Sequence, residues 1–155
     1  MFAAMGVHSG LPAGAAHNAA SGFLAMQRGA PGDRPTVAVP TIVFHGDTDT
    51  VVHPRNGRFV VARSLSAHPR LKKVVRKGCS PGGRDYSVTA HRARAGKSFC
   101  EHWVVEGAGH AWSGGHHSGS YTDPAGPDAS REMLRFFLRH RLSIQQRRPA
   151  TIASR

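Results

Sequence analysis

The chain has 155 residues, 39% of them hydrophobic, and a formal net charge of +12. This length allows one domain with a buried core, and no apolar run approaches the roughly 20 residues that a membrane-spanning helix needs. The first residues also lack the basic start of a secretory signal peptide. The charge alone would fit nucleic-acid binding, but no RNA-binding aromatic motif, zinc-finger spacing or recognition-helix pattern accompanies it. We therefore expect no specific nucleic-acid partner and no membrane partner.

The N-terminal third of the chain predicts a strand, a helix and a second strand. Residues 2–7 form a short apolar run that indicates a buried parallel strand. A short helix is expected over 21–28, with Ser21 as its N-cap and Gly29 as its stop. Residues 37–44 have the clearest strand pattern, which we expect to begin near residue 41 because a proline precedes it.

The middle of the chain predicts a second helix followed by a hairpin. Proline suits the first turn of a helix, so we expect a helix from Pro54 to about residue 65. Its expected apolar face is formed by Phe59, Ala62 and Leu65. Residues 71–75 indicate a small strand. Residues 86–90 and 99–105 alternate in polarity on either side of a turn, which predicts a hairpin.

The last third of the chain predicts a long loop, a helix and a tail. Residues 107–127 are rich in Gly and Pro, and long loops of this kind are commonly functional or disordered. Asp128 is the expected N-cap of a final helix. The apolar stripe of that helix is expected to comprise Met133, Leu134, Phe137 and Leu138. We expect one domain over 1–140 and a flexible basic tail over 141–155. Alternating strands and helices with an inserted hairpin predict an α/β fold with a mostly parallel sheet.

Two loops that follow strand ends carry residue types found in hydrolytic sites. Asp49 ends the sequence His-Gly-Asp-Thr-Asp, and His110 lies within Gly-Ala-Gly-His-Ala-Trp. Parallel sheets place their chemistry at the carboxyl ends of the strands. A histidine there can take a proton from a hydroxyl group while a carboxylate orients the ring. Asp47 is the alternative acid, and both aspartates are also residue types that serve turns and helix caps.

A serine nucleophile to accompany this pair is not evident. The sequence Gly-Cys-Ser-Pro-Gly at 78–82 has the form Gly-x-Ser-x-Gly. Pro81 follows Ser80, however, and a proline has no N–H group to donate to an oxyanion. Ser80 also follows Asp49, whereas the order in α/β-hydrolases is serine, acid, histidine. We therefore interpret residues 78–82 as a turn.

The histidines and cysteines predict neither a metal nor another cofactor. His110, His116 and His117 form the best histidine cluster, but adjacent histidine side chains diverge and no Cys or acidic ligand has zinc spacing. Cys79 and Cys100 are compatible either with one disulfide or with two free thiols.

Three stretches resemble the polyhydroxybutyrate-depolymerase family of esterases, a branch of the α/β-hydrolases. They are residues 6–16, 40–57 and 107–133, and the resemblance covers roughly 1–140. It implies hydrolysis of a polyester or small ester through an acyl-serine intermediate, with Asp49 as the acid and His110 as the base. It also implies an extracellular protein.

In that family the nucleophile turn and the oxyanion loop precede the segment that matches Met1. The resemblance therefore implies an incomplete α/β-hydrolase fold that lacks the N-terminal strands and is inactive alone. Trp112 and Tyr121 are the expected substrate-binding residues. One alternative is a non-catalytic remnant that binds a ligand at these two residues. The other is a basic nucleic-acid-binding protein. The sequence leaves the ester and the oligomeric state open.

Overall fold

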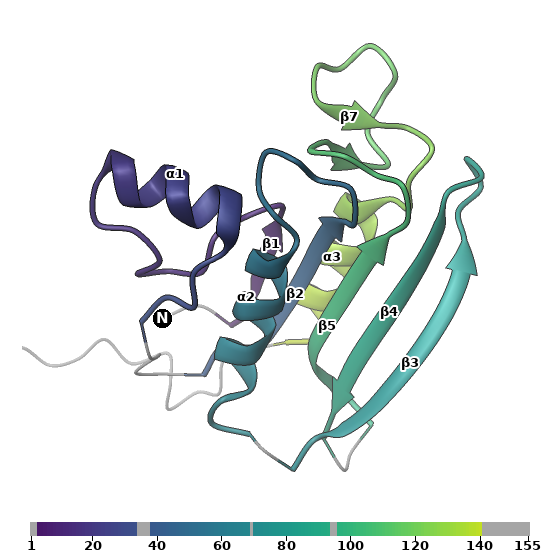
Figure 1. Cartoon of the computed structure of the whole chain (residues 1–155). Helices are drawn as coiled ribbons and strands as arrows, with labels where there is room; N and C mark the ends of the chain where they lie inside the picture. The colour runs from purple at the N-terminus through teal and green to yellow at the C-terminus, as the bar shows by residue number, and fades with distance from the viewer. Residues whose placement is uncertain (1–2, 34–37, 69, 94–95, 141–155) are drawn as a thin grey trace, which may run out of the picture.

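The computed structural model describes residues 3–33, 38–68, 70–93 and 96–140. These residues form a twisted five-stranded sheet with α2 packed in front and α3 behind (Figure 1). The sheet contains β1 (Met5–His8), β2 (Thr41–Gly46), β3 (Lys72–Cys79), β4 (Asp85–Arg92) and β5 (Ser98–Val105). The helices are α1 (Ala19–Arg28), α2 (Arg55–Leu65) and α3 (Ala129–Leu138). Two further short strands, β6 (Trp112–Ser113) and β7 (Thr122–Asp123), pair with each other.

The sheet is mixed, so the prediction of a mostly parallel α/β-hydrolase sheet was wrong. The strand order is β1-β2-β5-β4-β3. β1 and β5 run parallel to β2, whereas β4 is antiparallel to β5 and β3 is antiparallel to β4. The expected hairpin between β4 and β5 exists. It is not an insertion, because β5 is the central strand of the sheet and β3 extends the hairpin into a three-stranded antiparallel unit.

Two apolar layers, one on each face of the sheet, form the core. All six residues of β2 are buried, and their side chains alternate between the two layers. One layer joins Ile42 and Phe44 to Trp103 and to Met133 and Phe136 of α3. The other joins Val43 and Cys100 to Val60 and Val61 of α2. Burying each large apolar side chain stabilises the fold by about 1.5–3 kcal/mol, so β2 is the most strongly anchored strand.

The first strand and the first helix differ in detail from the predictions. β1 pairs in parallel with β2 as expected, but Met5 and Gly6 are exposed because β1 is an edge strand of the described sheet. The N-cap of α1 is Asn18, not Ser21. The two residues form a capping box in which the Asn18 side chain accepts from the Ser21 N–H. Gly29 ends α1 at a φ of +77°, as predicted.

The buried face of α2 differs from the predicted one. α2 begins directly after Pro54 and ends at Leu65 as expected, but Ala62 is exposed. The buried residues are Asn56, Gly57, Val60, Val61 and Ser64. The Asn56 amide accounts for the difference, since it donates to the Ala25 carbonyl of α1 at 2.8 Å and so holds the two helices together.

The predicted stripe of α3 is also only partly correct. Asp128 caps the helix as predicted, accepting from the Arg131 N–H at 2.9 Å. Met133 is buried, but the other members of the stripe, Leu134, Phe137 and Leu138, are 57%, 37% and 67% exposed. Phe136 is buried in their place. The helix therefore turns the positions 129, 133 and 136 toward the sheet.

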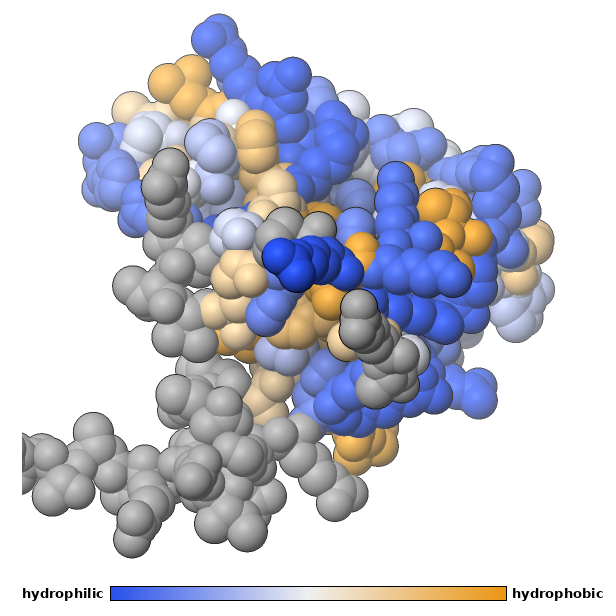
Figure 2. Space-filling model, turned by 90° about the horizontal axis from the view of Figure 1, so that it is seen from below, coloured by the Kyte–Doolittle hydropathy of each residue, from blue (hydrophilic) through white to orange (hydrophobic). Residues whose placement is uncertain are grey.

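The antiparallel edge of the sheet is charged. β3 is longer than the predicted strand over 71–75, and Lys72, Lys73, Arg76 and Lys77 are exposed along it. Charged side chains on an edge strand oppose pairing with another sheet. Figure 2 shows a largely hydrophilic surface at the lower end of the molecule, with apolar residues in patches between. The predicted tail over 141–155 and residues 2 and 37 of the predicted strands lie outside the described residues.

Candidate active site

Asp49 is held by the turn that follows β2. Its carboxylate is fully buried, and Oδ1 accepts from the N–H groups of Val51 at 3.0 Å and Val52 at 2.8 Å. Gly46 precedes this turn, and a Cβ atom there would overlap the carbonyl oxygen of Ala108. The glycine therefore allows the turn after β2 to approach the loop after β5.

His110 reaches Asp49 from the loop that follows β5. The His110 Nδ1 atom lies 2.9 Å from Asp49 Oδ2. Thr48 fixes the two loops together, because its N–H and its hydroxyl both donate to the Ala108 carbonyl, at 3.2 and 2.9 Å. An ionised carboxylate only accepts hydrogen bonds, so Nδ1 carries a proton. In the neutral ring, Nε2 then has the free lone pair that a general base needs.

The electrostatics favour an ionised Asp49. Burial acts to raise the pKa of this carboxyl group, but the Val52 N–H, the hydrogen bond with His110 and the Val51 N–H together hold it below its ordinary value. The side chain of His110, in contrast, is 33% exposed. The pair thus consists of a fixed buried anion and an imidazole that a ligand can reach.

The other candidate residues are engaged in turns. Asp47 Oδ1 accepts from the Gly107 N–H at 2.7 Å, so Asp47 braces the loop after β5 and Asp49 is the aspartate on His110. The Ser80 hydroxyl donates to the Ala125 carbonyl and accepts from the Arg84 N–H in the turn between β3 and β4. The interpretation of residues 78–82 as a turn is therefore confirmed for 80–82, whereas Gly78 and Cys79 form the end of β3.

His45, which the sequence analysis did not select, stabilises the turn that holds Asp49. It is the fifth residue of β2 and is 1% exposed. Its Nε2–H donates to the Val52 carbonyl at 2.7 Å, and the same nitrogen lies 3.5 Å from Asp49 Oδ2. A histidine inside an otherwise apolar strand, directly before Gly-Asp, is the signal that could have identified it.

His8 and Ser9, at the carboxyl end of β1, were also missed. The His8 ring stacks between Phe44 and Trp112, with centroid distances of 5.8 and 4.6 Å. The Ser113 N–H donates to His8 Nε2 at 3.0 Å. Ser9 has a φ of +47°, which residues other than glycine rarely adopt. Its buried Oγ has no hydrogen-bond partner among the described residues. The sequence His-Ser-Gly after an apolar run was the available signal.

These residues surround a cavity of about 450 Å³. Its lining comprises His8, Ser9, Val51, His110, Ala111, Trp112 and Tyr121. The loop over 107–127, which includes β6 and β7, projects above the carboxyl ends of β2 and β5 (Figure 1). Both predicted substrate-binding residues therefore line the cavity that His110 lines, and Tyr121 is 79% exposed at its rim.

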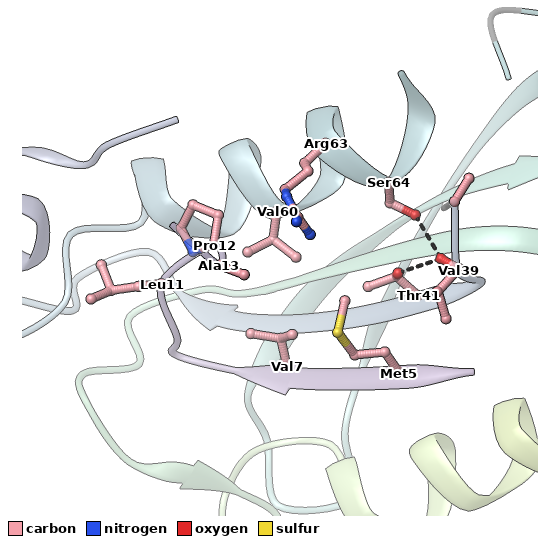
Figure 3. A pocket seen from close by; sticks show the side chains of 11 residues that line it. Met5, Val7, Leu11, Pro12, Ala13, Val39, Thr41, Val60, Arg63 and Ser64 are labelled. Atoms are coloured by element: carbon pink, nitrogen blue, oxygen red, sulfur yellow. Dashed lines mark hydrogen bonds between the residues drawn. The ribbon is translucent and has the colours of Figure 1, made fainter. Parts of the chain in front are cut away.

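A second pocket of about 250 Å³ lies beside β1 and α2 and offers no comparable chemistry (Figure 3). Its wall is mainly apolar, with Met5, Val7 and Val60 among its residues. The hydroxyl groups of Thr41 and Ser64 both donate to the Val39 carbonyl, at 2.7 and 3.1 Å. Because these hydroxyl groups are already engaged, the pocket beside His110 is the better candidate for a reactive site.

The remaining features concern metal ligands, cysteines and helix length. Within the described residues, no group of three or more His, Cys, Asp or Glu side chains is arranged to hold a metal ion. Both cysteines are free thiols, Cys79 exposed and Cys100 buried, which decides between the two alternatives that the sequence allowed. None of the described helices is long and apolar enough to cross a membrane.

Comparison with known proteins does not assign this chain to a family: no family model matches it, and no curated protein matches it either.

Proposed function

We propose that this chain supplies the acid and the base of a carboxylic-ester hydrolase of the polyhydroxybutyrate-depolymerase type. The observation that supports this proposal best is the 2.9 Å contact between His110 Nδ1 and the buried Asp49 Oδ2, beside a cavity that His110 lines. An oriented imidazole next to an accessible space is what acyl transfer to and from a serine requires.

In the proposed reaction, His110 Nε2 takes the proton of a serine hydroxyl as its oxygen attacks the ester carbonyl. Asp49 stabilises the imidazolium that forms. The ring then protonates the leaving alcohol, and it later activates the water that hydrolyses the acyl-serine. Trp112 and Tyr121 contact the substrate. The cycle uses no metal or other cofactor.

The proposed mechanism also needs a serine nucleophile next to His110. No serine hydroxyl lies within hydrogen-bond distance of His110 among the described residues. We propose that the serine and the oxyanion donors lie on a segment outside this sequence, and that the complete enzyme acts outside the cell. The isolated chain should therefore hydrolyse 4-nitrophenyl butyrate no faster than buffer does. Turnover that survives purification and disappears in Ser80→Ala would contradict this.

The mechanism can be tested by joining the chain to the segment that it would need. The N-terminal half of an active esterase of this type, with its oxyanion loop, strand, Gly-x-Ser-x-Gly turn and helix, would be fused ahead of it. We expect Asp49→Asn to lower kcat by about 10⁴-fold in the fusion, because the amide favours the wrong tautomer. His110→Ala should cost at least as much.

Asp47→Asn is the matched control, because Asp47 lies two residues away and braces the same loops. It should cost far less than Asp49→Asn. Trp112→Ala should raise KM more than it lowers kcat. The proposed mechanism would be refuted if the two aspartate variants lowered kcat equally, or if His110→Ala left the kcat of the fusion unchanged.

One observation favours a second candidate, a binding protein without turnover. The cavity has a mainly apolar lining, yet its base His110 has no hydroxyl partner in the described residues. A fusion that folds, binds an ester and never hydrolyses it would favour this candidate.

A further inference from the structure

The cavity beside His110 contains a second imidazole, and three contacts fix its orientation. His8 lies between two aromatic rings, nearly parallel to Phe44 at an interplanar angle of 5° and at 21° to Trp112. The Ser113 N–H donates to its Nε2 atom at 3.0 Å. The stack fixes the plane of the ring, and a 180° flip within that plane would lose the hydrogen bond from Ser113.

The hydrogen bond from Ser113 also decides which nitrogen of His8 carries the proton. A backbone N–H only donates, so Nε2 must present its lone pair, and the proton of the neutral ring resides on Nδ1. Nδ1 has no hydrogen-bond partner among the described residues, while the ring lines the cavity that His110 lines. An N–H group at a cavity wall is available to an acceptor on a ligand.

The surroundings of His8 keep the ring neutral. Burial, with smaller contributions from the nearby His45 and His110 rings, lowers the pKa of His8 to about 4. At neutral pH the group is a hydrogen-bond donor without a positive charge. It offers little attraction to an anion beyond that of any neutral donor.

The rest of the cavity is suited to a neutral and partly apolar ligand. Val51, Ala111 and Trp112 provide apolar wall, and the ionised Asp49 lies directly behind His110. A carboxylate bound here would meet that negative charge without a cationic partner, whereas a ketone or ester carbonyl would meet only a neutral donor.

We propose that His8 is a substrate-binding residue whose Nδ1–H donates a hydrogen bond to the carbonyl oxygen of a short, neutral carbonyl compound bound against Trp112. This rests on the proposed function for the identity of the natural ligand as an ester. It goes beyond that function by adding a donor from this chain, which positions the carbonyl oxygen together with the oxyanion donors of the outside segment. It also implies that an acid product binds more weakly than its ester.

The test uses binding without bond cleavage, so that it is independent of the missing serine. The probe is 2-pentanone, a ketone with the carbonyl of a short ester, and butyrate is the charged comparison. Long-range proton–nitrogen NMR spectra of the ¹⁵N-labelled chain report the tautomer of each histidine. We expect His8 to be the Nδ1–H tautomer. We also expect 2-pentanone to shift the His8 and Trp112 ring signals along one common saturation curve.

Two variants test the role of the donor. His8→Phe keeps an aromatic ring in the stack and removes the N–H group, so we expect it to bind 2-pentanone about 3- to 10-fold more weakly, as loss of one hydrogen bond implies. His17→Phe, at an exposed histidine before α1, should leave the affinity unchanged. Butyrate should bind at least 3-fold more weakly than the ketone.

Several results would overturn the inference. They are an Nε2–H tautomer in the unmodified chain, ketone binding that shifts Trp112 but not His8, equal affinities for ketone and butyrate, or no ketone binding at all. The first of these needs no variant and so does not depend on the folding of His8→Phe. None of them bears on acyl transfer by His110. Conversely, a fusion indifferent to His110→Ala would refute the proposed hydrolase and leave the measured carbonyl binding standing.

Discussion

The parallel half of the sheet carries the candidate active site, whereas the antiparallel half carries a tight turn and a basic edge strand. In the parallel half, β1, β2 and β5 all end at one edge, where His8, Asp49 and His110 lie. In the antiparallel half, β3 and β4 run as a hairpin whose turn at Ser80 is closed by its own hydrogen bonds, and exposed basic residues line β3. Parallel pairing gathers the following loops at one place, whereas antiparallel pairing spreads successive loops over both ends.

The largest expected difference between the halves is in the free energy of unfolding. Phe44 on β2 is fully buried between His8 and Trp103, at centroid distances of 5.8 and 4.9 Å. Phe44→Ala should cost about 3–5 kcal/mol, through lost burial and the cavity left behind. Val75 on β3 is 54% exposed, so Val75→Ala should cost less than about 1 kcal/mol. Urea denaturation of both variants measures the difference, and similar losses would contradict it.

The sequence allowed the site in the parallel half to be predicted, but not the antiparallel half of the sheet. Asp49 and His110 could be paired from the sequence because each follows a strong strand within a few residues, and parallel strands bring such loops together. The relative directions of the strands could not be predicted from the same pattern of strands and loops. Residues 72–79 alternate weakly and are largely exposed, so hydrophobic periodicity gave no sign that they extend the hairpin into a third strand.

Buried polar residues were the other group that the sequence could not reveal. Asn56 and His45 are buried because their partners, Ala25 and Val52, are supplied by other segments. Periodicity treats such residues as solvent-facing. Periodicity therefore predicted that Ala62 belongs to the buried face of α2, and it gave no sign that His45 supports the Asp49 turn. His8 and Ser9 escaped notice for the same reason, since their importance depends on the 107–127 loop reaching them.

The next largest expected difference in the free energy of unfolding is between alanine substitutions at two glycines of the site, Gly46 and Gly109. Gly46→Ala places a Cβ atom against the Ala108 carbonyl, so it should cost about 1–3 kcal/mol through forced displacement of the backbone. Gly109→Ala, beside His110, meets no atom within 4 Å and should cost less than about 1 kcal/mol. The Asp49–His110 contact should weaken in the first variant only. Loss of the low-field proton signal of His110 Nδ1–H in Gly46→Ala, and its retention in Gly109→Ala, would support this. Equal effects would show that the close approach of the two loops is unimportant.

The central strand should make stability depend on pH. Burial lowers the pKa of His102 on β5 to about 4, with smaller contributions from His45, Arg58 and His91. The ordinary value is about 6.5. Because the folded pKa is the lower one, the unfolded chain binds a proton first as the pH falls. Stability from this group is therefore present above pH 6.5 and is lost between about pH 6.5 and 4.

The variant His102→Leu should flatten this pH dependence by up to about 3 kcal/mol between those limits. His8 titrates over the same window, since its pKa is lowered to about 4 as well, so some dependence should remain. Thermal unfolding from pH 7 to pH 4 measures the slope. His17→Leu, at an exposed position, is the control. An unchanged slope in His102→Leu would contradict the assignment to this residue.

The smallest expected effect concerns the basic strand and tests the nucleic-acid alternative. Lys73 and Lys77 lie exposed on β3, away from the cavity, so Lys73→Gln with Lys77→Gln should change stability by no more than about 0.5 kcal/mol. Any DNA binding should be weak, because charge without base contacts gives only sequence-independent attraction. If β3 contacts phosphates, the double variant should reduce the slope of log affinity against log salt by about two, and by the same amount on unrelated DNA sequences. If the chain instead prefers one DNA sequence and the double variant abolishes that preference, the antiparallel half is a second functional surface. The inference that only the parallel half carries a functional site would then be wrong.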